Sequence, residues 1–361
     1  MKSDGILVGK FLPLHRGHLT HIFNSYSQCE NLNIVICSNK KLDVSLCKEA
    51  GIKYISPDLR MRWLIEELKG FNNIKIFILN EDEDTLDYPD GWESWSNQLK
   101  NLIFQNSLCK EWKNFAIFTG EKIDIEFYKH YFPSAEVYYF DYSLSRYPIS
   151  ATQIRKEPLK YWDYICGSAR SFFAKKILIT GTESTGKTSL TKMLAKIFHT
   201  SWAEEAGRIY VEQNVKDERY ITDQDYLNII NTQIEYNNYA LKTCNKICFF
   251  DTDIIVTYYY YLLYKQETNS KEISKEFENL FKSIYETQYK DLYDYKFFMS
   301  SKGVRWVDDG LRQHFSNRSE LDITLFNYYN KFNSFDLNFV DGNYNNRFTT
   351  VYKFCRNLID D

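Results

Sequence analysis

The chain lacks any excess of positive charge, since 45 Lys and Arg residues stand against 48 Asp and Glu residues and give a formal net charge of -3. Proteins that bind nucleic acid without sequence preference need a basic field to neutralise phosphates. We therefore expect no nucleic-acid partner. The chain also lacks an uncharged apolar run of about 18 residues, and its first residues are too polar for a signal peptide. We expect neither export nor a membrane span.

Cysteine pairs and glycines are also sparse. The eight cysteines are scattered, and the closest two, Cys244 and Cys248, have no second pair at zinc-binding spacing. We interpret them as reduced thiols of a cytoplasmic protein. Glycine contributes only 14 of 361 residues, well below its usual share of about 7%. A cluster of glycines is therefore informative in this sequence.

The length of 361 residues favours two domains, at about 150 residues per domain, and a hydrophobic content of 44% can supply two cores. Short β-rich runs alternate with longer helical patterns in both halves, which predicts βαβ units and parallel sheets. We place the boundary near residue 170, giving domains 1–170 and 171–361 of an α/β protein. The predicted strands begin near Gly5, Asn33, Ile74, Phe115, Glu136, Lys176, Ile247, Lys296, Val304 and Leu337.

The first strand runs into the segment HRGH at 15–18, directly ahead of a helical pattern. This order places His15 and His18 where a helix N-terminus meets the carboxyl edge of the sheet, a position that favours phosphate. The alternative is a pair of histidines that only caps the helix. A second segment, ISATQIR at 149–155, has an N-cap serine and then a hydroxyl and a guanidinium, which suit a polyphosphate. Taken alone, it is equally typical of an ordinary capped helix.

Residues 181–188 read GTESTGKT, which matches GxxxxGK[ST] in full between a β-rich run and a helical pattern. In such a loop Lys187 reaches the β- and γ-phosphates of ATP and Thr188 holds Mg²⁺. The predicted ATP site of this half comprises Gly181, Glu183, Ser184, Thr185, Gly186, Lys187, Thr188 and Ser189.

Two acids follow the apolar run at 247–250. One could order Mg²⁺ and the other could accept the proton of an attacking hydroxyl. We assign the proton to Asp251 and the metal to Asp253 together with Thr188. The reverse assignment stays open, as does a strand end that is simply solvated.

Together, the histidine motif and the segment at 149–155 resemble the nucleotidyltransferase superfamily, whose members carry HxGH after the first strand and ISxTxxR late in a Rossmann-like domain. The resemblance covers roughly residues 4–165. It implies that a mononucleotide phosphate attacks the α-phosphate of ATP, with His15 and His18 as catalytic residues and no covalent intermediate. It implies that the triphosphate is bound by Gly9, Phe11, His15, His18, Ser150, Thr152 and Arg155.

The order of an HxGH domain followed by a P-loop domain is similar to that of the NadR-type bifunctional proteins, which pair nicotinamide mononucleotide adenylyltransferase with ribosylnicotinamide kinase. The strings GKFLPLHRGH, YPDGWESW, ISATQIR, FDTD and DDGLR also look like that family. The resemblance implies a P-loop kinase fold in the second half, with Lys187 and Asp251 as catalytic residues. It further implies ATP, Mg²⁺, nicotinamide riboside, the mononucleotide and NAD as small-molecule partners. A homo-oligomer is left open.

The segment YPDGWESW suggests a nicotinamide site, because Trp92 and Trp95 could offer a π-face to a cationic ring. Two core tryptophans are equally plausible. Asp251 and Asp253 would belong to the nicotinamide site of the second domain, and Arg312 and Arg318 lie in a polar stretch that suits a lid.

Two other functions fit the same motifs. One is a pantetheine-phosphate adenylyltransferase joined to a dephospho-coenzyme A kinase, which the tryptophan string and FDTD disfavour. The other is an adenylyltransferase with an ATP-sensing, non-catalytic P-loop domain. Regulatory relatives of the NadR type carry an N-terminal helix-turn-helix domain. Because this chain starts at the first strand, we do not expect a repressor role.

Overall fold

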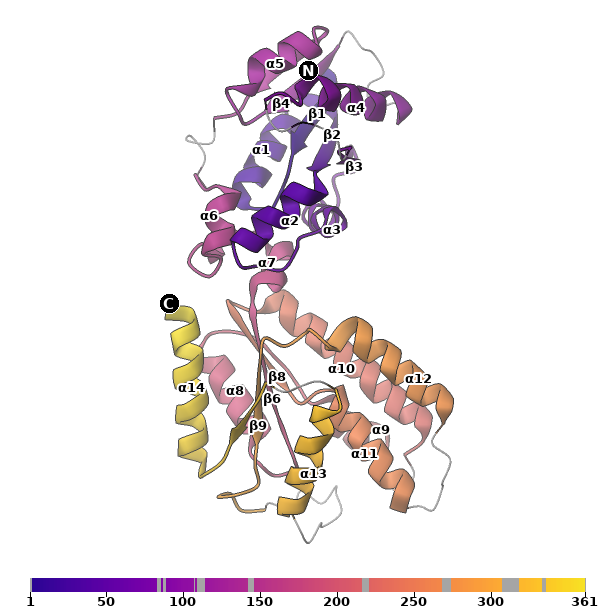
Figure 1. Cartoon of the computed structure of the whole chain (residues 1–361), viewed down its shortest axis with the longest axis vertical. Coiled ribbons are helices and arrows are strands. Elements are labelled where there is room, and N and C mark those ends of the chain that lie inside the picture. Colours follow the sequence, from indigo (N-terminus) through magenta and orange to yellow (C-terminus); the bar gives the residue numbers. More distant parts are fainter. Residues whose placement is uncertain are drawn as a thin grey trace. The chain divides into compact units, whose positions relative to one another are not determined.

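The computed structural model describes residues 2–82, 86, 89–106, 108, 114–141, 146–215, 221–267, 274–306, 318–332 and 336–360. The chain divides into two compact units, Met1–Phe172 and Phe173–Asp361. Each unit is built around a five-stranded sheet in which the paired strands are parallel (Figure 1). The predicted α/β class with two tandem domains is confirmed.

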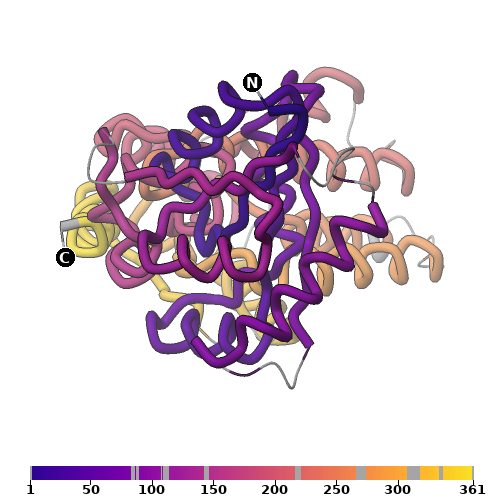
Figure 2. The backbone as a smooth tube through the Cα atoms, turned by 90° about the horizontal axis from the view of Figure 1, so that it is seen from above, coloured from indigo at the N-terminus to yellow at the C-terminus, as the bar shows by residue number. Residues whose placement is uncertain are grey.

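The first unit has the strand order β3-β2-β1-β4-β5. Its strands are β1 (Lys2–Gly9), β2 (Cys29–Ser38), β3 (Ile74–Asn80), β4 (Phe115–Thr119) and β5 (Ala135–Tyr139). All five strands predicted for this half are confirmed. The central strands β1, β2 and β4 contain continuous apolar runs, because helices cover both faces of a parallel sheet. Figure 2 follows this unit from indigo to magenta. The helices are α1 (Arg16–Tyr26), α2 (Lys40–Glu49), α3 (Pro57–Glu67), α4 (Trp92–Gln105), α5 (Asp124–Tyr131), α6 (Ala151–Lys156) and α7 (Gly167–Phe173).

The second unit has the strand order β10-β9-β6-β8-β7. Its strands are β6 (Lys175–Gly181), β7 (Trp202–Ala203), β8 (Ile247–Asp251), β9 (Tyr295–Met299) and β10 (Leu337–Val340). Its helices are α8 (Lys187–Ile197), α9 (Ala206–Asn214), α10 (Asp223–Thr243), α11 (Ile254–Glu267), α12 (Lys275–Ile284), α13 (Arg318–Asn330) and α14 (Tyr344–Asp360). The core includes Ile177, Ile179, Leu194 and Phe249, which are fully buried.

One predicted strand is wrong in its described part. Residues 304–306 are irregular, because the chain turns at Gly303 (φ 90°) and the first residue of α13 then holds the segment. Arg318 donates to the Val304 carbonyl at 3.1 Å and lies 5.5 Å over the Trp306 ring. Conversely, the strand β7 was not predicted, because its two residues are too few to form a pattern.

Two further findings concern the whole described chain. The cysteines in the described ranges are free thiols, and all of them are buried. In those same ranges, no helix combines the length and the apolar character needed to cross a membrane.

Candidate active sites

A cavity of about 900 Å³ lies at the carboxyl edge of the first sheet. Its lining includes the segments that directly follow β1 and β4, together with the first turn of α6. The strand β1 lies between β2 and β4, so chain connections diverge here, and open α/β sheets bind ligands at such a point. The volume is that of a small-molecule site.

His15 and His18 both line this cavity and form a reciprocal cap at the start of α1. Each ring Nδ1 accepts a hydrogen bond from the other residue's backbone N–H, and both bonds measure 3.4 Å. The rings stack with their centroids 3.6 Å apart. Since Nδ1 accepts in both rings, a neutral imidazole carries its proton on Nε2. Capping therefore leaves one donor nitrogen on each histidine.

Burial decides the charge of these histidines. It lowers the pKa of His15 to about 3 and holds the pKa of His18 well below its ordinary value, with the neighbouring His15 and His21 lowering it further. Both rings are thus neutral near pH 7 when no anion is bound. The glycine between them has a steric reason, because a Cβ on Gly17 would lie 3.0 Å from the His15 ring and 3.2 Å from the Tyr147 carbonyl.

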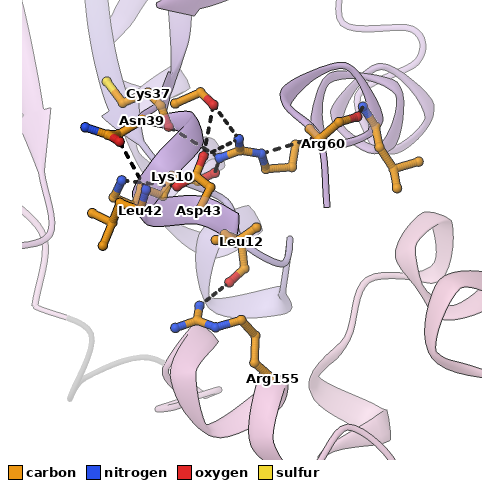
Figure 3. A network of polar contacts seen from close by, with 11 residues as sticks. Lys10, Leu12, Cys37, Asn39, Leu42, Asp43, Arg60 and Arg155 are labelled. Carbon is orange, nitrogen blue, oxygen red and sulfur yellow. Dashed lines mark hydrogen bonds and ion pairs between the residues drawn. The ribbon is translucent and has the colours of Figure 1, made fainter. Parts of the chain in front are cut away.

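The loop between β1 and α1 is held from α6. Arg155 donates to the Leu12 carbonyl at 2.5 Å and to the Thr152 hydroxyl at 3.0 Å, and Figure 3 shows its guanidinium directed at Leu12. Ser150 caps α6 by accepting from the Gln153 amide at 3.2 Å. The segment at 149–155 is thus a capped helix, and Ser150, Thr152 and Arg155 also line the cavity.

The other two predicted residues of this site, Gly9 and Phe11, also line the cavity. Phe11 has a φ of 49°, and its ring meets His18 edge to face with centroids 5.0 Å apart. A Cβ on Gly9 would lie 3.1 Å from the Phe11 ring. The predicted phosphate-binding residues are therefore brought together at one cavity.

The two tryptophans of the YPDGWESW segment lie in the first turns of α4. Trp92 is 7% exposed and stacks on Phe127 with centroids 5.0 Å apart. It is therefore a core residue with an edge at the cavity. Trp95 is half-buried, meets Trp92 at 4.9 Å, and also lines the cavity.

Several lining residues were not predicted from the sequence. They include one cation, Lys10, one histidine, His21, and four acids, Glu81, Glu121, Asp124 and Asp141. Glu121 lies two residues after the end of β4, so its place at a strand tip was the available signal. For Glu81 the corresponding signal is the end of β3.

In the second unit, residues 181–188 form the predicted loop between β6 and α8. Lys187 is the first residue of α8, and its Nζ donates to the Thr182 carbonyl at 2.8 Å. Gly186 has a φ of 83°, and a Cβ there would lie 2.7 Å from the Tyr344 ring. Gly181, Glu183, Ser184, Thr185, Thr188 and Ser189 occupy the loop and the first turn of α8.

The two acids after the strand differ in their surroundings. Asp251 is buried at the end of β8, and neither carboxylate oxygen has a hydrogen-bond partner of normal geometry in the described residues. Burial, aided by Glu205, raises the pKa of Asp251 to about 7, against the opposite effects of Lys187 and Thr188.

Asp253 is also buried, but its carboxylate accepts hydrogen bonds. Its Oδ1 accepts from the Tyr329 hydroxyl at 2.7 Å and from the Ile255 amide at 3.1 Å, which caps α11. Burial raises the pKa of Asp253 to about 6. The acid that is left for a ligand is therefore Asp251.

A small cavity of about 60 Å³ lies beside these acids. Its walls carry two carboxylates, Glu183 and Glu205, and the ring of Tyr226. Buried Gln233 fixes one wall, since its amide binds the Ala206 N–H at 2.9 Å and the Glu204 carbonyl at 3.0 Å. The remaining lining residues are Gly207, Val211, Ile221, Ile229, Thr252, Val256, Thr257, Tyr260 and Tyr264.

The backbone of the P-loop is held by α13 and α14. Arg318, which we predicted to lie in a lid, donates to the Glu183 and Ser184 carbonyls at 3.3 and 3.2 Å. Arg312 lies outside the described residues. Asp322 accepts from the Thr182 hydroxyl, and Arg347 donates to the Thr185 carbonyl at 2.9 Å. Asp322 and Arg347 were not predicted, because no motif marks them.

No set of three His, Cys, Asp or Glu side chains in the described ranges is arranged to hold a metal ion by itself. A metal in the second unit would therefore depend on few protein ligands. The phosphates of a nucleotide would supply the others, as Mg²⁺ sites in nucleotide-binding enzymes commonly require.

The comparisons with known proteins agree with this geometry. A family model described as an AAA domain matches residues 176–347. The chain is 30% identical over 365 residues to the trifunctional NAD biosynthesis/regulator protein NadR of Escherichia coli (strain K12), an alignment that covers 100% of this chain and 84% of the relative. The chain belongs to the NadR family. The NadR protein of Salmonella typhimurium (strain LT2) is 35% identical over 259 residues, which are 71% of this chain and 62% of that protein.

Solved NadR structures extend the likeness to the whole fold. The crystal structure of NadR in complex with NAD and AMP-PNP has 25% identity and a TM-score of 0.78, covering 100% of this chain and 97% of that one. The structure of NadR in complex with NR has 25% identity and a TM-score of 0.79, covering 99% and 97%. As a NadR-family protein, the chain is an enzyme of nucleotide metabolism.

Proposed function

We propose that this protein makes NAD in two steps, each in its own unit. The second unit phosphorylates nicotinamide riboside with ATP, and the first unit transfers an adenylyl group from ATP to the resulting mononucleotide, releasing pyrophosphate. The observation that supports the proposal is that two separate loops, the β1–α1 loop with its histidine pair and the P-loop before α8, each lead from a strand to a helix N-terminus, a place that favours phosphate. Family membership supports it, because the curated relatives are named for NAD biosynthesis.

The charges of the first cavity suit a dipolar substrate. Lys10, Arg155 and the histidine pair line the part formed by the β1–α1 loop and α6, whereas Glu121, Asp124 and other acids line the cavity as well. A mononucleotide with an anionic phosphate and a cationic pyridinium ring needs both positively and negatively charged groups in its site. Trp95 offers the ring a partly exposed π-face.

The chemistry of the first unit requires only positioning and charge stabilisation. The Nε2 donors of His15 and His18 can bind the phosphate charge that develops as the mononucleotide attacks the α-phosphate. Because both rings are neutral without a ligand, they act as hydrogen-bond donors and not as permanent cations. Arg155 and Lys10 supply the fixed positive charge.

In the second unit, Lys187 serves the β- and γ-phosphates of ATP and Asp251 accepts the proton of the riboside hydroxyl. A carboxylate with a pKa near 7 is well matched to that task. The acids of the small cavity, Glu183 and Glu205, favour a cationic nucleoside over a neutral one.

Mg²⁺ neutralises phosphate charge in such reactions. Thr188, in the first turn of α8, provides the hydroxyl that fits this ion alongside the nucleotide phosphates. Asp253, whose Oδ1 accepts from Tyr329 and from the amides of α11, would contribute to the ion through its Oδ2.

The proposal is tested by supplying riboside and mononucleotide separately, with ATP and Mg²⁺, to wild type, His18→Ala and Lys187→Ala. His18→Ala should lose about 10² to 10³ of the adenylyl-transfer rate and keep riboside phosphorylation. Lys187→Ala should show the reverse. Phosphorylation of dephospho-coenzyme A in place of riboside would contradict the proposal. If Lys187→Ala stopped both reactions in a folded protein, the P-loop unit would be a switch instead.

A further inference from the structure

A buried ion pair lies beneath the β1–α1 loop, outside every motif in the sequence. Arg60 of α3 and Asp43 of α2 form it, with a distance of 2.7 Å between Nη2 and Oδ2, and both side chains are 0% exposed. Ser38, at the end of β2, joins the two residues. It accepts from Arg60 at 2.9 Å and donates to Asp43 at 2.9 Å.

Arg60 also holds the backbone of the cavity loop. Its Nη1 donates to the Lys10 carbonyl at 2.8 Å and to the Cys37 carbonyl at 3.3 Å. Further along the loop, Arg155 holds the Leu12 carbonyl, and the Cys166 amide reaches the Leu14 carbonyl at 3.5 Å. Three alternate carbonyls of the loop are thus bound by groups from other elements. The loop that carries the histidines to α1 is fixed at each of these points.

Asp43 acts on the loop's side chain as well. Its Oδ1 lies 3.4 Å from the Lys10 ammonium, which lines the cavity and is 39% exposed. One carboxylate therefore serves two cations, Arg60 and Lys10, and the three side chains together keep one positive charge. Because Arg60 is enclosed and Lys10 is not, that surplus charge is presented at the cavity.

We infer that Asp43 and Arg60 are positioning residues of the first site, which set the loop backbone and the Lys10 ammonium for the triphosphate of ATP. This inference rests on the proposed adenylyl transfer. It predicts that the pair matters to the rate for a reason other than stability, because a buried ion pair can often be replaced by apolar residues without loss of stability.

The test compares Arg60→Lys with a double variant, Arg60→Met combined with Asp43→Leu. Arg60→Lys keeps the charge but removes the fork that spans Asp43, Ser38 and the two carbonyls. The double variant removes the pair without leaving a buried charge. The control is Lys2→Met, which breaks the pair of Lys2 with Glu136, 2.7 Å apart at the opposite end of β1.

Melting temperature, kcat and KM for both substrates are measured, and the amplitude of the first unit's unfolding transition gives the amount of folded protein, because riboside phosphorylation would report only on the second unit. We expect the double variant to melt near wild type, yet to lose about 10² in adenylyl-transfer rate, as a small misplacement of the reacting groups does. KM for ATP should rise more than KM for the mononucleotide. The control should match wild type.

A double variant with wild-type adenylyl transfer would overturn the inference and leave the pair a purely structural element. Measuring ATP binding in a Lys187→Ala background distinguishes a failure of this inference from a failure of the proposed function. If wild type transferred no adenylyl group, the proposed function would fail. Weaker ATP binding by Arg60→Lys in that background would still support the positioning role, and unchanged binding would refute it.

Discussion

Replacing Asp251 by Asn should make the protein more stable and, at the same time, inactive as a kinase. The Asp251 carboxyl is buried without a hydrogen-bond partner of normal geometry in the described residues, and burial raises its pKa from 3.8 to about 7. That difference corresponds to about 4 kcal/mol of unfavourable free energy for holding the ionised form in the fold. Asn has nearly the same shape and cannot ionise, so about 4 kcal/mol is the upper bound of its gain.

The pH dependence of this stability gain follows from the same difference between the folded and unfolded pKa of Asp251. Below about pH 4 the carboxyl is protonated in both the folded and the unfolded chain, and the substitution should change little. Between about pH 4 and pH 7 the unfolded chain releases the proton first, so the stability of wild type falls relative to the variant. The advantage of Asp251→Asn should be complete above about pH 7.

The assay is urea denaturation of both proteins at pH 5, 6, 7 and 8, alongside riboside phosphorylation at pH 7 to 8. The variant should lose about 10² to 10⁴ in phosphorylation rate, and the wild-type rate should rise with pH around an apparent pKa near 7. The matched control is Asp253→Asn, whose amide oxygen can still accept from Tyr329 and cap α11, so more activity should remain. A less stable Asp251→Asn at pH 8, or near-normal turnover, would refute the reasoning.

Three further predictions concern the two sites. Trp92→Ala should cost about 3 to 5 kcal/mol of stability because its ring is packed in the core, whereas Trp95→Ala should chiefly raise KM for the mononucleotide; equal losses of stability in denaturation would contradict this division. Gly186→Ala, at a φ of 83° and against the Tyr344 ring, should weaken ATP binding by the second unit and spare adenylyl transfer from supplied mononucleotide. Thr182→Val removes the hydroxyl bound to buried Asp322 and should lower stability by about 1 to 3 kcal/mol while raising KM for ATP in riboside phosphorylation, which unchanged kinetics would disprove.

The parts that the sequence predicted well are those encoded locally. The central strands of the first sheet contain continuous apolar runs. Both predicted phosphate-binding loops follow a strand and open a helix, so each could be recognised within about ten residues. A two-residue strand such as β7 has no pattern to recognise. The segment at Val304 has alternating apolar residues, but contacts with Arg318 decide its conformation.

The residues that support the two sites could not be predicted, because their role depends on contacts between distant parts of the chain. Arg60 and Asp322 look like ordinary helix residues, and only the fold brings them to the Lys10 carbonyl and the Thr182 hydroxyl. The fate of Trp92 likewise depends on aromatic neighbours from α5. The roles of the individual site residues in catalysis stay predictions.

Several of these contacts join residues that lie far apart in the sequence, and this affects the order in which the sites form during synthesis. The P-loop ends at residue 188, but its partners Asp322 and Arg347 are separated from Thr182 and Thr185 by 140 and 162 positions along the chain. A ribosome must therefore deliver nearly the entire second unit before the P-loop can acquire its final supports. The loop of the first unit waits in the same way for Arg155, 143 positions after Leu12. Because domains tend to fold as units during synthesis, the site of the first unit should mature on the nascent chain first, and a chain that ends before α14 should leave the P-loop without Arg347.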